Sequence, residues 1–209
     1  RITGTTGILT PGGNITITKM GTGANGATIS APVALDADRT FTVTDDGTSA
    51  NDLTITGIIS GGYGLIKAGT GTLLLSGANT FTGITTVNAG IIKLGSGGNT
   101  TNTPLGTATA GTVVATGAML DLAGYNLATA EGLTLNGSGI AGSGALTNSY
   151  ANTITYTGAI VLGSASSISS TGTLNLTGII SGSNSLTKTG TGTVSLSGIN
   201  TFTGGVTLN

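Results

Sequence analysis

The sequence has 209 residues, enough for one or two ordinary domains, and is rich in glycine (39) and threonine (43). Its six basic and seven acidic residues give a net charge of −1, which excludes the basic face of a nucleic-acid-binding protein. Histidine and cysteine are missing, which excludes Ser–His–Asp and Cys–His catalysis, disulfides and thiolate metal sites.

Short runs of β-branched and aliphatic residues predict strands along the chain. In chain order they are residues 15–18, 40–44, 53–56, 72–75, 153–157 and 173–176. Each run is bounded by Gly, Asn, Ser or Asp, the residues that favour tight turns. Since 37% of the residues are hydrophobic, the chain can bury a core. The turn residues recur too often for long helices, and a helical turn is conceivable only at 127–135.

An internal repeat is the dominant pattern of the sequence. Residues 53–88 align without a gap to residues 174–209, at an offset of 121 residues and with 23 of 36 positions identical. Residues 27–35 match 154–162 more weakly at an offset of 127, so the first copy has an insertion within 36–52. We expect one continuous segment, 1–209, cut from a longer repetitive chain. Its copies are at about 25–95 and 152–209, with a spacer at 96–151.

The repeat favours a solenoid over an antiparallel sandwich or barrel, because a unit that cannot bury its own apolar face must stack on its neighbours. We therefore predict an all-β fold, a parallel β-helix or β-solenoid. A turn of roughly 20 residues predicts about ten rungs, and a rung spacing of about 4.8 Å predicts a rod of about 50 Å. No apolar run reaches the length of a membrane-spanning helix.

Residues shared by the two copies are expected to build the rungs. Inward aliphatic ladders are predicted from Ile58, Ile59, Leu65, Leu73, Leu75, Val87, Ile91 and Leu94, and from Ile179, Ile180, Leu186, Val194, Leu196 and Leu208. Two equivalent aromatic residues, Phe81 and Phe202, are expected to fill the core beside a turn. The predicted corner residues are Gly77, Asn79 and Gly83, with their counterparts Gly198, Asn200 and Gly204. Asparagine at a corner can stack with another asparagine and hydrogen-bond along the axis.

The motifs SGANTFTG (76–83) and SGINTFTG (197–204), each preceded by KxGxGTxxLSG, resemble the autotransporter-associated β-strand repeat. That repeat belongs to the passenger regions of bacterial autotransporters and related giant surface proteins. The resemblance covers residues 59–95 and 180–209, about a third of the chain. It implies a right-handed parallel β-helix, export to the bacterial cell surface in association with the outer membrane, and a role as a stalk or in passenger folding.

Candidate chemistry rests on lysines and carboxylates. Ser–Lys catalysis is formally open through Lys19, Lys67, Lys93 or Lys188, but the repeat equivalence of Lys67 and Lys188 favours solvent-exposed rung positions. Paired carboxylates serve glycoside hydrolysis or calcium binding. The acids are Asp36, Asp38, Asp45, Asp46 and Asp52 in the insertion, with Asp121 and Glu131 elsewhere. A polar surface loop is the favoured interpretation of the insertion, and a recognition loop is the alternative.

We expect a structural segment: a stalk, spacer or fibre of an extracellular bacterial surface protein, without enzymatic activity, catalytic residues, cofactor or metal. Its expected partners are neighbouring repeats of the same chain, and unpaired strand edges are compatible with end-to-end or lateral self-association. Two alternatives stay open. One is an adhesin that binds a host surface or glycan through residues 36–52, and the other is a carbohydrate-active enzyme on a β-helix.

Overall fold

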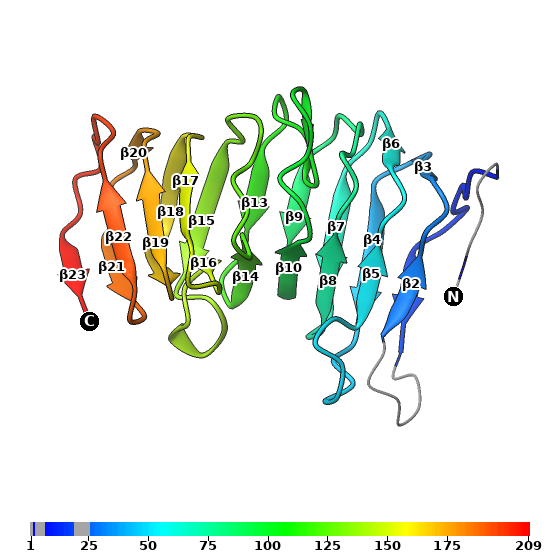
Figure 1. Cartoon of the computed structure of the whole chain (residues 1–209), viewed down its shortest axis with the longest axis horizontal. Helices are drawn as coiled ribbons and strands as arrows, with labels where there is room; N and C mark the ends of the chain where they lie inside the picture. The colour runs from blue at the N-terminus through cyan, green and yellow to red at the C-terminus, as the bar shows by residue number, and fades with distance from the viewer. Residues whose placement is uncertain (1, 3–6, 19–25) are drawn as a thin grey trace.

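The computed structural model describes residues 2, 7–18 and 26–209, which form a parallel β-solenoid (Figure 1). Lys19 lies outside the described residues. The strands stack along the long axis of the molecule, with β2 (Ala27–Ile29) and β23 (Val206–Leu208) toward opposite ends of the stack (Figure 1). Pairing between turns is parallel, as in Ile15–Phe41 and Leu53–Leu73. The predicted all-β solenoid is therefore confirmed, and the antiparallel sandwich is excluded.

Each turn passes over three faces, which we call A, B and C in the order that the chain visits them. Face A contains β2 (Ala27–Ile29), β5 (Leu53–Ile55), β8 (Thr72–Leu75), β10 (Gly90–Leu94), β14 (Ala118–Asp121), β16 (Leu146–Asn148), the second half of β18 (Ile160–Ser170), β21 (Leu186–Thr189) and β23 (Val206–Leu208). Ile2 bridges to Ile29 below β2, which adds a tenth level to these nine strands. This agrees with the predicted ten rungs.

Faces B and C complete the turn. Face C contains β1 (Ile15–Ile17), β4 (Arg39–Val43), β7 (Leu65–Ala68), β9 (Thr85–Val87), β13 (Thr112–Val114), β15 (Leu133–Gly137), the first half of β18 and β20 (Ile180–Ser181). Face B contains β3 (Val33–Leu35), β6 (Ile59–Gly61), β17 (Thr153–Tyr156), β19 (Thr173–Leu176) and β22 (Thr193–Leu196). Outside the faces lie β11 (Asn102–Thr103), which pairs antiparallel with β12 (Gly106–Thr107), and the 3₁₀ turn η1 (Ile140–Gly142).

A turn within the repeats takes 20 residues, the predicted length. On face A, Leu73 pairs with Leu53, and further along the axis Lys188 pairs with Ile168. Longer turns carry a loop between faces. The insertion predicted within 36–52 is one such loop, residues 44–52 between β4 on face C and β5 on face A.

The two sequence copies occupy different faces of the solenoid. Leu53 lies on face A, whereas its counterpart Leu174 lies on face B, in the ladder β17–β19–β22. Lys67 lies on face C and its counterpart Lys188 on face A. The offset of 121 residues is therefore not a whole number of turns, and the second copy is rotated by one face. The three faces are close enough in geometry to accept the same sequence.

Aliphatic ladders fill the interior, with alternating residues pointing in and out of each strand. Most predicted ladder residues of the first copy are buried, among them Ile59, Leu73 and Leu75. The prediction is wrong for Ile58 and Ile179, which are about half exposed at corners. It is also wrong for Ile91, because its neighbour Ile92 is the buried residue of that strand. It is also wrong for Leu208, which is 77% exposed in the last turn.

The helical turn considered for 127–135 is not present. Residues 133–137 are strand β15, and residues 127–132 have no helical assignment. Leu133 and Leu135 point into the core and pair with Ile160 and Leu162 on the next turn. Tertiary stacking therefore decides the conformation of this stretch, where local composition is ambiguous.

Candidate functional site

The shared asparagine of the repeat joins successive turns. Asn79 is buried, its Oδ1 accepts a hydrogen bond from the Ile59 backbone N–H at 2.7 Å, and its Nδ2 donates to the Pro104 carbonyl at 2.6 Å. Asn200 makes the first of these contacts in the second copy, where its Oδ1 accepts from the Ile180 N–H at 2.9 Å. The asparagine hydrogen-bonds along the axis, as predicted, but its partners are backbone groups of adjacent turns and not another asparagine.

The shared glycines and phenylalanine lie where turns approach closely. A Cβ on Gly77 or Gly83 would lie within 3 Å of atoms of the turn below, and the same holds for Gly198 and Gly204 in the second copy. Phe81 is fully buried, and the next turn passes over its ring at Gly106, whose φ of +101° and close approach both require glycine. Phe202 is only partly buried.

Lys67 occupies an interior position, contrary to the prediction of a solvent-exposed rung position. It stacks between Phe41 and Val87 in the ladder of face C and is fully buried. Its Nζ donates to the carbonyls of Ala68 (2.9 Å), Gly69 (2.7 Å) and Ala89 (3.0 Å). Burial lowers the pKa of Lys67 to about 8, and the charge of Asp52 opposes that shift. The ammonium thus joins two turns.

Lys188 repeats part of this arrangement. Its Nζ donates to the Gly190 carbonyl, the counterpart of the Lys67–Gly69 contact, and Gly69 and Gly190 share a φ near +77°. The side chain of Lys188 is only partly buried, in line with its place near the last turn. The KxG element of the motif is therefore a structural corner. Ser–Lys chemistry finds no support at either lysine, because the Nζ atoms bind main-chain carbonyls.

The five acids of the insertion divide into two groups. Asp36 pairs with Arg39 at 2.6 Å, and the Asp38 Oδ1 accepts from the Gly64 N–H at 2.7 Å. Asp45, Asp46 and Asp52 come together in the loop 44–52, each with a carboxylate oxygen within 4.8 Å of the others. The fold therefore assembles three of the predicted candidates and leaves two apart.

The carboxylates of the loop are engaged by the loop itself. Asp46 accepts hydrogen bonds from the backbone and hydroxyl groups of Thr48 and Ser49, and these bonds hold the pKa of Asp46 well below its usual range. Asp52 accepts from the Asp46 N–H at 2.9 Å and from the Thr72 N–H at 2.7 Å. These contacts fix the loop on the next turn, as expected of acids in a structured turn.

Glu131 is a buried carboxyl with a raised pKa. It is fully buried, its Oε1 accepts from the Thr112 hydroxyl at 2.9 Å, and its Oε2 has no partner. Burial raises the pKa of Glu131 to about 7. The Tyr156 hydroxyl donates to the Glu131 backbone carbonyl, and burial, followed by the charge of Glu131, raises the pKa of that tyrosine well above its usual value. The sequence offered no signal for this group, because burial of a lone acid depends on tertiary packing.

Asp121 and Lys93 lie on adjacent strands of face A. Their charged atoms are 4.0 Å apart, and the Lys93 Nζ lies 5.5 Å from the ring centre of Tyr150. Asp121 also accepts from the Ser149 hydroxyl at 2.7 Å. These contacts tie the spacer turns together.

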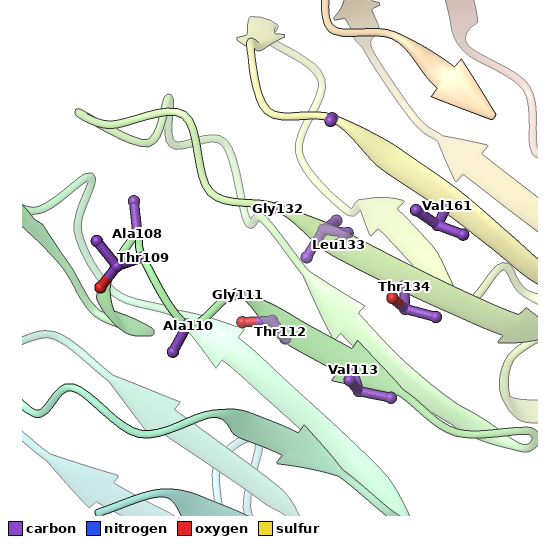
Figure 2. A pocket seen from close by; sticks show the side chains of 11 residues that line it. Ala108, Thr109, Ala110, Gly111, Thr112, Val113, Gly132, Leu133, Thr134 and Val161 are labelled. Atoms are coloured by element: carbon purple, nitrogen blue, oxygen red, sulfur yellow. The ribbon is translucent and has the colours of Figure 1, made fainter. Parts of the chain in front are cut away.

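A surface groove of about 260 Å³ runs beside face C (Figure 2). Val113, Thr134 and Val161 project side by side from three adjacent strands along it. Its inner edge is formed by residues with little or no side chain, Gly111 and Gly132 among them. This groove leaves no signal in the sequence, because its residues come from three turns.

The comparisons with known proteins agree with this geometry. The family model of the passenger-associated-transport-repeat matches residues 65–94 and 186–209, about a quarter of the chain. The search of curated proteins and the search of solved structures gave no match. Among the described residues, no helix is long and apolar enough to cross a membrane. Both matched segments begin at the strand that carries the corner lysine, Lys67 or Lys188. Two segments of the chain thus match the passenger-associated-transport-repeat, which confirms the resemblance to the repeats of autotransporter passengers.

Proposed function

We propose that this segment is a structural stalk or spacer of a secreted or outer-membrane-associated bacterial surface protein. The observation that carries the proposal is the use of the shared residues. Asn79, Phe81 and Lys67 contact adjacent turns of the solenoid, and Asn200 repeats the contact of Asn79 to the preceding turn. A repeat whose shared residues serve stacking extends a rod, and the rod lengthens with copy number.

A non-enzymatic role is part of the proposal. The acids of the loop 44–52 bind the loop's own N–H and hydroxyl groups, and Glu131 is buried. A glycosidase needs two carboxyl groups facing a substrate across roughly 5–10 Å. The alternative of an adhesin that uses residues 36–52 has less support, because the same acids fix the loop on the solenoid.

The experiment varies the number of turns. One, two or four extra copies of residues 169–188 are inserted after Lys188, and the maximum dimension is measured by small-angle X-ray scattering. We expect about 4.8 Å of added length per turn. A dimension that does not grow with the number of turns would contradict the stalk.

A companion variant separates the alternatives. Residues 46–50 are replaced by a Gly-Ser link, and binding to host-cell surfaces and glycans and turnover of a polysaccharide panel are measured alongside. If the segment is a stalk, we expect the variant to keep the length of the parent chain. We also expect the parent chain to show neither surface or glycan binding nor polysaccharide turnover. Binding that disappears with the loop would favour the adhesin, and turnover lost on Asp→Asn changes would favour the enzyme.

A further inference from the structure

The corner between faces B and C carries an ordered pattern of large and small residues. Six consecutive levels along it are Gly64, Ile84, Gly111, Gly132, Ala159 and Ile179. Successive members of this column are neighbours, because the backbone N–H of the residue that follows each member donates to the carbonyl of the next member. Examples are Leu65 N–H to Ile84 O (3.1 Å) and Leu133 N–H to Ala159 O (2.9 Å). The two isoleucines are each 49% exposed.

Two recesses alternate with these isoleucines. The groove of Figure 2 spans Gly111, Gly132 and Ala159, with a volume of about 260 Å³. A second recess of about 210 Å³ lies at Gly64, on the other side of Ile84. The recesses exist because glycine or alanine occupies the corner there, whereas isoleucine projects from it at the neighbouring levels.

The pattern is complementary to itself when it is reversed. If a second copy is turned antiparallel, about a two-fold axis between Gly111 and Gly132, then Ile84 of each copy faces Ala159 of the other. In the same arrangement Ile179 faces Gly64, and Gly111 faces Gly132. All six levels then pair small with large or small with small. A parallel arrangement in register would place Ile84 against Ile84 and leave both recesses empty.

The adjacent outer surface of face C is compatible with such pairing. Its outward column, read along the register, is Thr40, Ile66, Thr86, Val113, Thr134, Val161 and Ser181. These side chains are short, β-branched or small and uncharged, so a second copy of the same column meets no like-charge repulsion. The Asp36–Arg39 pair and Asp38 lie at one end, where the antiparallel copy presents Ile179 and not another acid.

We propose that the B–C corner and face C form a homotypic lateral interface, in which two copies of this chain pair antiparallel about a two-fold axis. Ile84 and Ile179 of each copy enter the recesses at Ala159 and Gly64 of the other. Such an isologous contact closes on itself. It is narrow, so we expect a dissociation constant on the order of 100 μM. A stalk works with or without pairing, so failure of this proposal leaves the proposed function intact.

The first test uses substitutions read out by sedimentation velocity between 10 and 500 μM. Gly132→Leu fills the groove, and a Cβ there meets no atom within 4 Å, so the fold is kept. Ile84→Ala removes the projecting side chain. We expect each to weaken dimerisation about tenfold or more, since one displaced apolar contact per copy costs about that factor. The matched controls are Gly205→Leu, with equal space around its Cβ, and Ile58→Ala, at 48% exposure on another corner; both keep the parent's dissociation constant.

The second test fixes the orientation. The chain has no cysteine, so Ile84→Cys with Ala159→Cys introduces the sole thiols. Within one copy these positions are three levels apart, about 14 Å, too far for a disulfide. Oxidation should give a covalent dimer from the double variant and none from Ile84→Cys alone. A dimer from Ile84→Cys alone, or a chain that stays folded by circular dichroism and monomeric at 500 μM, would overturn the proposal.

Discussion

Lys67 shows how one residue can have different surroundings in two copies of a repeat. In the first copy its ammonium is buried and joins three carbonyls, whereas Lys188 is partly exposed and binds the Gly190 carbonyl. The third partner of Lys67, Ala89, belongs to the following turn. The lysine of the KxG element therefore depends on a neighbour in the stack for its full set of contacts.

We expect Lys67→Met to destabilise the protein by about 2 kcal/mol. Methionine removes the cost of burying an ammonium group, which offsets part of the loss. Three carbonyls lose their donor, however, and each buried group left unpaired costs about 1–3 kcal/mol. The measurement is chemical denaturation at pH 7. Lys188→Met is the matched control, with an expected loss below about 1 kcal/mol. Equal losses in the two variants would contradict the role of Lys67 as a link between turns.

Glu131 should make stability depend on pH in a defined window. Its pKa in the folded chain, about 7, lies above the ordinary value of 4.5. The unfolded chain therefore binds fewer protons than the folded one between these values, so stability is full below pH 4.5 and falls as the pH rises to about 7. The expected decrease in the free energy of unfolding across this window is about 3 kcal/mol.

Denaturation at a series of pH values checks this expectation with Glu131→Gln as the comparison. The amide does not titrate, so its stability should stay level from pH 4.5 to 7.5. Asp46 and Asp36, whose pKa values are lowered by hydrogen bonds, affect stability only below that window. A parent chain that shows no slope between pH 4.5 and 7.5 would rule out a buried neutral Glu131.

At the scale of single turns, the side-chain amide of asparagine supplies hydrogen bonds that a strand would otherwise make to the neighbouring turn. Between β8 and β9 the segment 79–82 has no strand assignment, yet it stacks on β6 through Asn79 Oδ1 and through the Thr80 N–H to Ile59 carbonyl bond (2.8 Å). The amide thus satisfies backbone groups at an irregular corner, which would otherwise carry a desolvation penalty.

We expect Asn79→Ala to cost about 3 kcal/mol, because the Ile59 N–H and the Pro104 carbonyl would both lose their partner in a buried site. Asn200→Ala should cost about 1 kcal/mol, since it loses a single contact, to the Ile180 N–H, at a partly exposed site. Thermal and denaturant unfolding of the two variants give the comparison. A larger loss for Asn200→Ala would show that the two corners are not built alike.

At the scale of the whole molecule, stability should increase with the number of turns. Each internal turn contacts one neighbour on either side, whereas the last strands, β22 and β23, leave Leu208 77% exposed and Phe202 partly exposed. In a solenoid, each added turn contributes its own stability plus one interface.

A chain with one extra 20-residue turn after Leu208 should therefore unfold at a higher temperature than the parent. The added turn covers Leu208 and Phe202 and brings a carbonyl to Lys188, as Ala89 does for Lys67. Calorimetry of the parent and of chains with one and two added turns checks the trend. An added sequence of equal length and composition with its order scrambled is the control and should leave the melting temperature unchanged.

The sequence by itself determined the solenoid, its 20-residue turn and the corner motif, because these follow from local patterns. Alternation of apolar residues, glycine at turns and a gapless repeat are visible along the chain, and the strands at 53–56 and 72–75 appeared as β5 and β8. Only the tertiary structure decided which residues of a strand face inward, as in Ile92 rather than Ile91 in β10 and Lys67 inside rather than outside in β7. It also decided the rotation of the second copy by one face and the alternation of Ile84 with the recess at Gly132. These features depend on which residues, 20 or more positions apart, become neighbours in successive turns. The lengths of the loops between faces set this alignment, and local sequence does not encode it.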